Sequence, residues 1–127
     1  MYSYSIGKDK SFKNNDYRVT RIKSILEYIH INYSREIVLS VLANTFSMGK
    51  GHFCRFFKSM VKMFVVDYVN SYRINVSTSL LTKTDKEVGE IACMVGFNNI
   101  SYFNKIFRKH MHCTPTEFRR GIKAEQF

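Results

Sequence analysis

The sequence predicts an all-α protein of seven helices, and three observations support this fold class. The chain of 127 residues contains one Pro and six Gly, few of the turn-forming residues that a β-rich protein uses. Apolar residues recur at spacings of three and four along most of the chain, which is the period of a helix. Apolar residues make up 45% of the sequence, so one compact domain of this length can bury a core.

The first expected helix follows a polar segment. Residues 1–17 are rich in Ser, Lys and Asn and have few apolar anchors, which predicts a flexible N-terminal arm. Beyond this arm, apolar residues fall on one stripe of a helix, at Val19, Ile22, Leu26, Ile29 and Tyr33. We assign this helix to a first lobe that spans residues 18–64.

An internal repeat relates the first lobe to a second one at residues 83–121. Residues 39–48, with the sequence LSVLANTFSM, recur 49 positions later at 88–97 as VGEIACMVGF. Residues 52–58 recur 50 positions later at 102–108, so one residue is inserted between the two blocks. A repeat of this kind indicates that one supersecondary unit is present twice.

Each copy of the repeat predicts two helices joined by a tight turn. The first block holds a small residue that lets a second helix approach closely, Ala43 in one copy and Ala92 in the other. Gly96 suits a left-handed turn after this helix, whereas Ser47, at the same place in the first copy, is a poorer fit. The second block is an amphipathic helix whose apolar side comprises Phe53, Phe56, Phe57 and Met60 in one copy and Phe103, Ile106, Phe107 and His110 in the other. Two helices joined in this way form a helix-turn-helix unit.

A long linker helix is expected between the two lobes, over residues 65–82. Its apolar positions again step in threes and fours, at Val65, Tyr68, Val69, Tyr72, Val76 and Leu80. About 17 residues at about 1.5 Å each give a rod of roughly 26 Å. Near the C-terminus, Pro115 predicts a last short helix with Thr116 as its cap, and residues 122–127 form a C-terminal tail.

The charge of the chain restricts its partners. Twenty Lys and Arg against ten Asp and Glu give a net charge of +10, which attracts polyanions. DNA, RNA and an anionic membrane surface are therefore the candidate partners. No apolar run approaches the roughly 18 residues of a membrane span, and the N-terminus has no apolar stretch typical of a signal peptide. A cytoplasmic protein, associated with the nucleoid if DNA is its partner, is expected.

Each amphipathic helix has a polar side opposite its apolar stripe. These polar sides carry residue types that can bind nucleic acids. In the first lobe they are Lys50, Gly51, Cys54, Arg55 and Lys58, and in the second Asn98, Asn99, Ser101, Asn104, Lys105 and Arg108. Arg can donate to both acceptors of guanine, Asn can pair with adenine, and Lys neutralises phosphate. Lys and Asn are common on any surface helix. Two copies of such a side in a chain of this charge nevertheless favour duplex DNA as the partner.

Three segments of the second lobe resemble the signature of the AraC/XylS family of bacterial transcription regulators. They are IACMVGF at residues 91–97, SYFNKIFRK at 101–109 and TPTEFR at 114–119. The resemblance covers about residues 19–120, nearly all of the DNA-binding domain of that family. It implies two helix-turn-helix lobes whose recognition helices enter successive major grooves on one side of the DNA. It also implies a sequence-specific regulator, more commonly an activator, with RNA polymerase as a second candidate partner.

The resemblance can be transferred residue by residue to candidate base-contacting positions. These fall on Gly51, Cys54 and Arg55 in the first lobe and on Ile100, Ser101, Asn104 and Lys105 in the second. Gly51 and Cys54 cannot form a bidentate contact with a base, so Arg55 is expected to carry most of the reading in the first lobe. The first lobe departs from the family at Ser47, where Gly is usual, and at residues 61–65, where a turn resembling Gly-x-Thr-Pro is usual.

The resemblance covers the DNA-binding domain alone, without the family's usual second domain. The chain is therefore expected to be either a stand-alone member or a C-terminal fragment of a longer regulator. We expect it to be a monomer, because no spare apolar stripe remains once the seven helices pack.

Two other classes of function remain as alternatives. A basic helical module could bind RNA or a membrane, or act as a protein-interaction domain of a larger regulator, but its aromatic residues fall on stripes expected to be buried. An enzyme is disfavoured, and no metal or cofactor is expected, because His110, His112 and Cys113 lie too close in sequence to converge on one ion. Cys93 is expected to pack in the interior and Cys54 to lie on the DNA-facing side.

Overall fold

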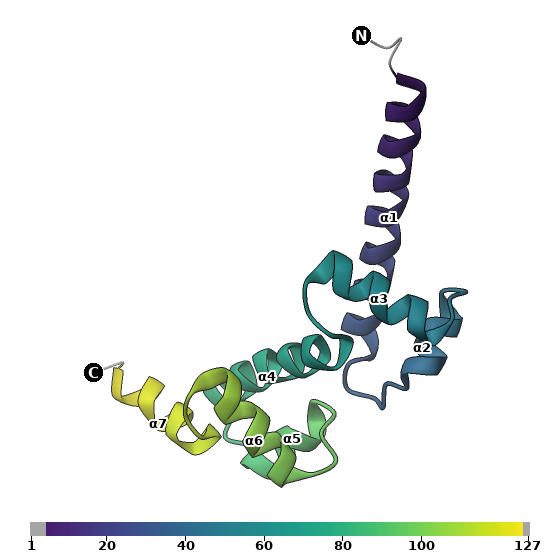
Figure 1. The fold of residues 1–127 in the computed structure, drawn as a ribbon. Helices are drawn as coiled ribbons and strands as arrows, with labels where there is room; N and C mark the ends of the chain where they lie inside the picture. Colours follow the sequence, from purple (N-terminus) through teal and green to yellow (C-terminus); the bar gives the residue numbers. More distant parts are fainter. Residues whose placement is uncertain (1–4, 126–127) are drawn as a thin grey trace. The chain divides into compact units, whose positions relative to one another are not determined.

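The computed structural model describes residues 5–125, and within this range it gives the side chains of residues 15–121. In this part of the chain all regular secondary structure is helical, which confirms the expected fold class (Figure 1). The helices are α1 (Ser5–Asn32), α2 (Leu39–Thr45), α3 (Lys50–Val61), α4 (Val65–Lys83), α5 (Val88–Met94), α6 (Ile100–Met111) and α7 (Pro115–Glu125). The chain divides into two compact units, one ending at Ile31 and the other beginning at Asn32.

α1 begins earlier than expected and buries a different stripe. Residues 5–17, expected to belong to the N-terminal arm, continue the helix, while residues 1–4 lie outside the described residues. Each residue added to an existing helix gains a backbone hydrogen bond, so a segment without Pro can extend it. The buried side chains of α1 are Ile22, Ile25 and Ile29. Val19 is exposed. Ile25 is buried and Leu26 is half-buried, since a period of 3.6 residues allows either position to continue the stripe.

α2 and α3 pack against each other and form the first helix-turn-helix unit. Their buried side chains are Leu42, Ala43, Phe53, Phe56 and Phe57. In the turn between the helices, the backbone amide of Met48 donates to the carbonyl oxygen of Ala43 at 3.0 Å. Ser47 has a φ of 58°, in the left-handed region. The turn therefore forms where the sequence predicts it, although the residue there carries a side chain.

α5 and α6 repeat this arrangement in the second helix-turn-helix unit. The backbone amide of Phe97 donates to the carbonyl oxygen of Ala92 at 2.9 Å, and Gly96 has a φ of 108°. The buried side chains of the two helices are Ile91, Ala92, Phe103, Ile106 and Phe107. The order of buried, half-buried and exposed positions along α6 is the same as along α3, residue for residue. The repeat in the sequence is thus a repeat in the structure.

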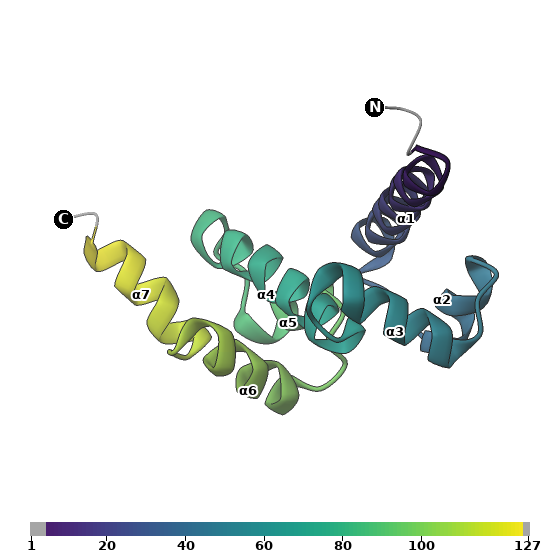
Figure 2. The same ribbon diagram turned by 45° about the horizontal axis from the view of Figure 1, so that its top comes forward.

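α4 contacts α3 of the first helix-turn-helix unit and both helices of the second, and it also contacts α7 (Figure 2). Its buried residues are Val65, Val69, Asn70, Ile74, Ser77 and Leu81. The other positions of the expected stripe are half-buried: Tyr68, Tyr72, Val76 and Leu80. A helix with several neighbours buries a broader surface than one stripe, which is why the prediction was incomplete. The buried hydroxyl of Ser77 donates to the carbonyl oxygen of Ile74 at 2.6 Å, so it is satisfied within the helix.

α7 is capped differently from the prediction. Pro115 is its first residue, where the missing amide costs no helical hydrogen bond. The Thr114 hydroxyl accepts a hydrogen bond from the Glu117 amide at 3.1 Å, and the Glu117 carboxylate accepts one from the Thr114 amide at 2.9 Å. This capping box shows that the expected cap at Thr116 was wrong. α7 continues to Glu125, so residues 122–125 of the expected tail are helical.

The second helix-turn-helix unit shares its core with α4. Ile74 and Leu81 belong to one hydrophobic cluster with the buried residues of α5 and α6. Phe107 of α6 also meets Phe118 of α7 edge to face, with the ring centroids 5.8 Å apart. Because this core holds α6 by one side, the opposite side of the helix is left exposed.

Candidate nucleic-acid interface

α3 presents most of its predicted recognition residues to solvent. Lys50, Gly51, Arg55 and Lys58 are exposed, and Cys54 is half-buried. These positions alternate with the three buried Phe residues of the helix. The packing that buries the apolar side therefore also orients the polar side outward.

α6 and the turn before it place the second set of predicted residues in the same way. Asn98, Asn99, Ile100, Ser101, Lys105 and Arg108 are exposed, and Asn104 is half-buried. Cys54 and Asn104 occupy equivalent positions of α3 and α6, each at the edge of the buried side. The predicted residues thus form two groups, one on each helix-turn-helix unit, instead of a single joint site.

Both groups carry positive charge without a carboxylate on the same helix. The basic residues are Lys50, Arg55 and Lys58 on α3 and Lys105, Arg108 and Lys109 on α6. Neither residues 50–61 nor residues 100–111 contain Asp or Glu. Such a surface attracts phosphate groups by a field of one sign.

Local contacts hold two of the predicted side chains in place. Asn99 is the N-cap of α6, and its side-chain oxygen accepts a hydrogen bond from the Tyr102 amide at 2.9 Å. This bond starts the helix, so the oxygen of Asn99 is engaged in the cap. On α3, the Nζ atom of Lys58 lies 4.1 Å from the centroid of the exposed Phe64 ring, a cation–π contact. The contact keeps the ammonium group at the surface.

Gly51 leaves room for the side chain of Arg55. A Cβ atom placed on Gly51 would lie 3.2 Å from Nη1 of Arg55, so the guanidinium extends over the glycine one turn earlier in the helix. A larger residue at position 51 would have to displace it. Gly51 therefore helps to place Arg55 on the exposed side, although it has no side chain of its own to offer a base.

Sequence reasoning left three exposed residues out of the predicted site. His52 and Tyr102 occupy equivalent positions in the first turns of α3 and α6, and Lys109 follows Arg108. The hydroxyl of Tyr102 accepts a hydrogen bond at 3.0 Å from the side-chain amide of the buried Asn70, which connects α6 to α4. The sequence repeat, with its offset of 50 residues, aligns His52 of α3 with Tyr102 of α6. This alignment is the signal by which both residues could have been found.

The structure corrects one expectation about the cysteines. Cys93 is exposed, whereas the sequence placed it in the interior. α5 buries Ile91 and Ala92, and the next residue of a helix points in another direction. Among the described residues, no three His, Cys, Asp or Glu side chains gather in a way that could bind a metal ion. None of the described helices is long and apolar enough to cross a membrane.

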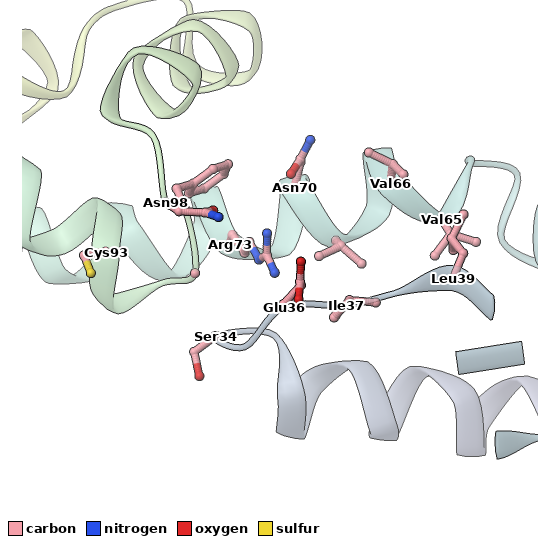
Figure 3. A pocket seen from close by; sticks show the side chains of 13 residues that line it. Ser34, Glu36, Ile37, Leu39, Val65, Val66, Asn70, Arg73, Cys93 and Asn98 are labelled. Carbon is pink, nitrogen blue, oxygen red and sulfur yellow. The ribbon is translucent and has the colours of Figure 1, made fainter. Parts of the chain in front are cut away.

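A groove of about 390 Å³ lies beside α4 (Figure 3). Its lining comes from the segment before α2, from α4, from Cys93 of α5 and from the turn that follows α5. Asn98, predicted to belong to the recognition surface, lines this groove together with Arg73. Burial lowers the pKa of the Arg73 guanidinium, against an opposing effect of Tyr102.

Two helix-turn-helix units with basic second helices define the class of protein, a helical nucleic-acid-binding domain. A helix-turn-helix domain family matches residues 42–121. The chain belongs to this family, and within it to the AraC type of transcription regulators.

Individual proteins of known sequence or structure agree with this assignment. YdeC of Bacillus subtilis, an uncharacterized HTH-type transcriptional regulator, is 35% identical over 100 residues, which make up 79% of this chain and 34% of that protein. The C-terminal domain of the two-component response regulator yesN from Fusobacterium nucleatum is 30% identical, with a TM-score of 0.74 over 76% of this chain and 95% of that one. This chain spans between about a third and a half of the length of the first curated relatives it matches.

A structure solved with DNA shares the fold. The DNA-binding domain of AdpA, in complex with a target DNA, has a TM-score of 0.78 with this chain at 20% identity. The match covers 81% of this chain and 93% of that one.

Proposed function

We propose that this chain binds duplex DNA in a sequence-specific manner and regulates transcription, with α3 and α6 as recognition helices in two successive major grooves. The observation that carries the proposal is the residue-for-residue match in burial between α3 and α6, each of which exposes basic side chains. Two equivalent helices of this kind can each occupy one of two successive major grooves of duplex DNA. The 19 residues of α4, at about 1.5 Å each, give a helix of about 28 Å, comparable with the roughly 34 Å helical repeat of DNA.

Arg55 and Lys105 are the proposed principal base readers, one for each groove. They are exposed at equivalent positions of α3 and α6. The Arg fork can donate to N7 and O6 of guanine, and Lys can donate to the same acceptors. Ser101 and Asn104 add donors and acceptors beside Lys105. Smaller and apolar positions allow close approach or contact with a thymine methyl group: Gly51, Cys54 and Ile100.

The remaining predicted residues are proposed to set the position of the protein on the phosphate backbone. Lys50, Lys58 and Arg108 supply positive charge next to the base readers. Asn98 precedes α6 and can donate to phosphate from its amide, whereas Asn99 fixes the start of the helix. These contacts add affinity for any sequence and contribute to salt dependence.

The two units also determine how many copies are needed. One chain carries two different helix-turn-helix units, so a single copy can fill the two half-sites that a dimer of single units would share. We therefore propose that the chain binds as a monomer to a non-palindromic site. Because the relatives are bacterial transcription regulators, we further propose action in the cytoplasm at the chromosome, and activation through contact with RNA polymerase.

The first experiment selects bound duplexes from a random pool and titrates the chain against the selected site. We expect a site of about 20 base pairs with two separate half-elements. About six to ten phosphate contacts should lower the affinity by about 10³ to 10⁵ between about 50 and 200 mM salt. Structured RNA and anionic vesicles serve as competitors. Equal affinity for all duplexes near physiological salt, or preference for RNA or vesicles, would contradict the proposal.

Substitutions then separate the two units. Arg55→Ala should cost about 1–3 kcal/mol of binding free energy and relax the preference in one half-element only, and Lys105→Ala should do so in the other. Lys58→Ala should weaken all sequences alike and lower the salt slope by about one. The measurement is a titration against site libraries randomised in one half at a time. If Arg55→Ala and Lys105→Ala relaxed the same base pairs, the arrangement in two grooves would be wrong even with DNA binding established.

A further inference from the structure

Arg73, in the middle of α4, binds the segment that leads into the first helix-turn-helix unit. Its Nε donates to the carbonyl oxygen of Tyr33 at 2.7 Å, and its Nη2 donates to the carbonyl oxygen of Arg35 at 2.8 Å. The Tyr33 ring packs edge to face on Tyr72, with the centroids 5.1 Å apart. The backbone just before α2 is therefore held to α4 by two hydrogen bonds and an aromatic contact.

The turn of the second helix-turn-helix unit meets Arg73 as well. A Cβ atom placed on Gly96 would lie 2.8 Å from the Tyr33 carbonyl oxygen and 2.9 Å from Nε of Arg73. The guanidinium carbon of Arg73 lies 5.6 Å from the centroid of the Phe97 ring. The guanidinium of Arg73 thus contacts two segments at once, the one before α2 and the turn between α5 and α6. We call this cluster of Tyr33, Arg35, Arg73, Gly96 and Phe97 the junction.

The junction makes use of properties that only Arg and Gly supply. A planar guanidinium can donate along two directions while an aromatic ring packs on its plane, which the ammonium group of Lys cannot do. Gly96 takes a φ of 108° and leaves the space that the carbonyl oxygen and Nε occupy. Arg73 lines the groove beside α4, where Figure 3 shows it between the segment that carries Glu36 and the turn that carries Asn98.

We propose that Arg73 is a positioning residue that sets the separation and angle of the two recognition helices. It thereby determines which spacing between the two half-elements of the DNA site the protein accepts. This inference rests on the proposed function. Once the first recognition helix has bound, a rigid connection holds the second at its groove and gives it a high effective concentration there. A loose connection lowers this effective concentration and lets the protein accept other spacings.

Arg119 provides a matched control within the same chain. Its Nε donates to the carbonyl oxygen of Leu81 at 2.9 Å, and its Nη2 donates to that of Lys86 at 2.8 Å. Both arginines are half-buried and donate to backbone carbonyl groups, Arg73 to two and Arg119 to a third one as well, that of Thr84 at 3.3 Å. Arg119, however, joins α7 to the end of α4 and the loop after it, so its contacts do not reach the first helix-turn-helix unit.

The experiment measures affinity for the selected site and for versions with one, two or three base pairs inserted between the half-elements. Each inserted pair rotates and shifts one half-element by about a tenth of a helical turn. The wild-type chain should lose affinity steeply with insertion. Arg73→Met should bind the original spacing about tenfold more weakly and lose little further with insertion, while its affinity for each isolated half-element stays within about twofold of wild type. Arg119→Met should keep the wild-type spacing profile.

Thermal unfolding is recorded for each variant, and Arg73→Gln serves as a milder change if Arg73→Met does not fold. Retention of the wild-type spacing profile by a folded Arg73 variant would overturn the inference. Equal loss of affinity for the isolated half-elements would do so too. Unfolding of both Arg73 variants while Arg119→Met folds would show that Arg73 is needed for folding rather than for spacing. If the wild-type chain prefers no DNA sequence, the proposed function itself fails. If wild type prefers the selected site and loses affinity with insertion, the proposed function stands, and the Arg73 variants then test the inference alone.

Discussion

The helices α2 and α3 bury the same positions as α5 and α6, but the helix starts within and directly after the two helix-turn-helix units are held differently. In the second unit, Asn99 caps α6 with its side chain, and Thr114 and Glu117 cap α7 through two reciprocal hydrogen bonds. In the first unit, the equivalent N-cap residues Gly49 and Phe64 make no side-chain hydrogen bond to α3 or α4. The side chains at these two N-cap positions therefore satisfy none of the first backbone amides of α3 and α4.

The turn residues, like the caps, are more favourable in the second unit than in the first. Both units require a left-handed residue after their first helix, and the second unit has Gly96 there. The first unit has Ser47, whose Cβ makes that conformation unfavourable by about 1 kcal/mol. The comparison teaches that core packing sets the positions of the helices in both units, while the stability of their ends depends on residues outside the core. We expect the first unit to open locally more readily than the second.

Substitution of the turn residues should give the largest difference between the units. Gly96→Ala should lower the free energy of unfolding by about 2–3 kcal/mol, because it adds strain at a positive φ and sets a Cβ against the Tyr33 carbonyl oxygen. Ser47→Gly should raise it by up to about 1 kcal/mol, because it removes strain in an exposed turn. Urea denaturation of the two variants and the wild type measures both changes.

Gly89→Ala is the control for the general effect of adding a methyl group. Gly89 lies within α5 and is exposed, so Ala there should be neutral or stabilising apart from a contact with Ile100 at 3.3 Å. If Gly96→Ala cost no more than Gly89→Ala, the left-handed turn and its contact with Tyr33 would not matter as argued. A loss of stability in Ser47→Gly would show that the serine stabilises the first turn in another way.

The N-caps should give the next largest difference. Asn99→Ala removes the hydrogen bond to the Tyr102 amide and should cost about 1 kcal/mol of unfolding free energy. Gly49→Asn places the same residue type at an extended N-cap position of α3 and should gain a few tenths of a kcal/mol. Amide hydrogen exchange at the first turns of α3 and α6 shows where each change acts. Equal exchange protection of the two first turns in the wild type would contradict the difference inferred between the units.

The fold was largely predictable because the repeat and the helix period are both direct consequences of packing. The turns at Ser47 and Gly96 and the stripes of α3 and α6 follow from residue type and spacing. The stripes of α1 and α4 were harder to place, because a period of 3.6 residues lets Ile25 or Leu26 continue one stripe. The burial of Asn70 and Ser77 depends on partners that no local pattern indicates.

The candidate site was predictable in composition and less so in detail. The exposed positions of α3 and α6 follow from the buried ones, so the residues proposed to face DNA could be named from the sequence. The engagement of Asn99 in a cap and the cation–π contact of Lys58 depend on three-dimensional geometry. The junction around Arg73 joins residues about 40 positions apart, and Cys93 was misplaced because the short α5 buries only one side.

The smallest expected effect is a pH dependence that belongs to the second unit. Hydrogen bonding of the Glu117 carboxylate to Thr114, foremost to its backbone amide, holds the pKa of this carboxyl below its usual range. A carboxyl whose folded-state pKa is lowered stabilises the fold above its unfolded pKa, near about 4.3, and loses that contribution as the pH falls through the folded value. Wild type should therefore exceed Glu117→Ala in stability at neutral pH, and the difference should shrink in acid.

The test compares the denaturation of wild type, Glu117→Ala and Glu117→Gln between neutral pH and about pH 3. Glu117→Gln keeps an acceptor for the Thr114 amide but does not titrate, so its difference from Glu117→Ala should not change with pH. Asp67→Ala makes the equivalent change in the first turn of α4, whose N-cap Phe64 has no hydroxyl group to form the reciprocal bond. If the advantage of wild type over Glu117→Ala persisted unchanged into acid, the stabilisation would come from packing or helix propensity, and the charged capping box would not distinguish the two units.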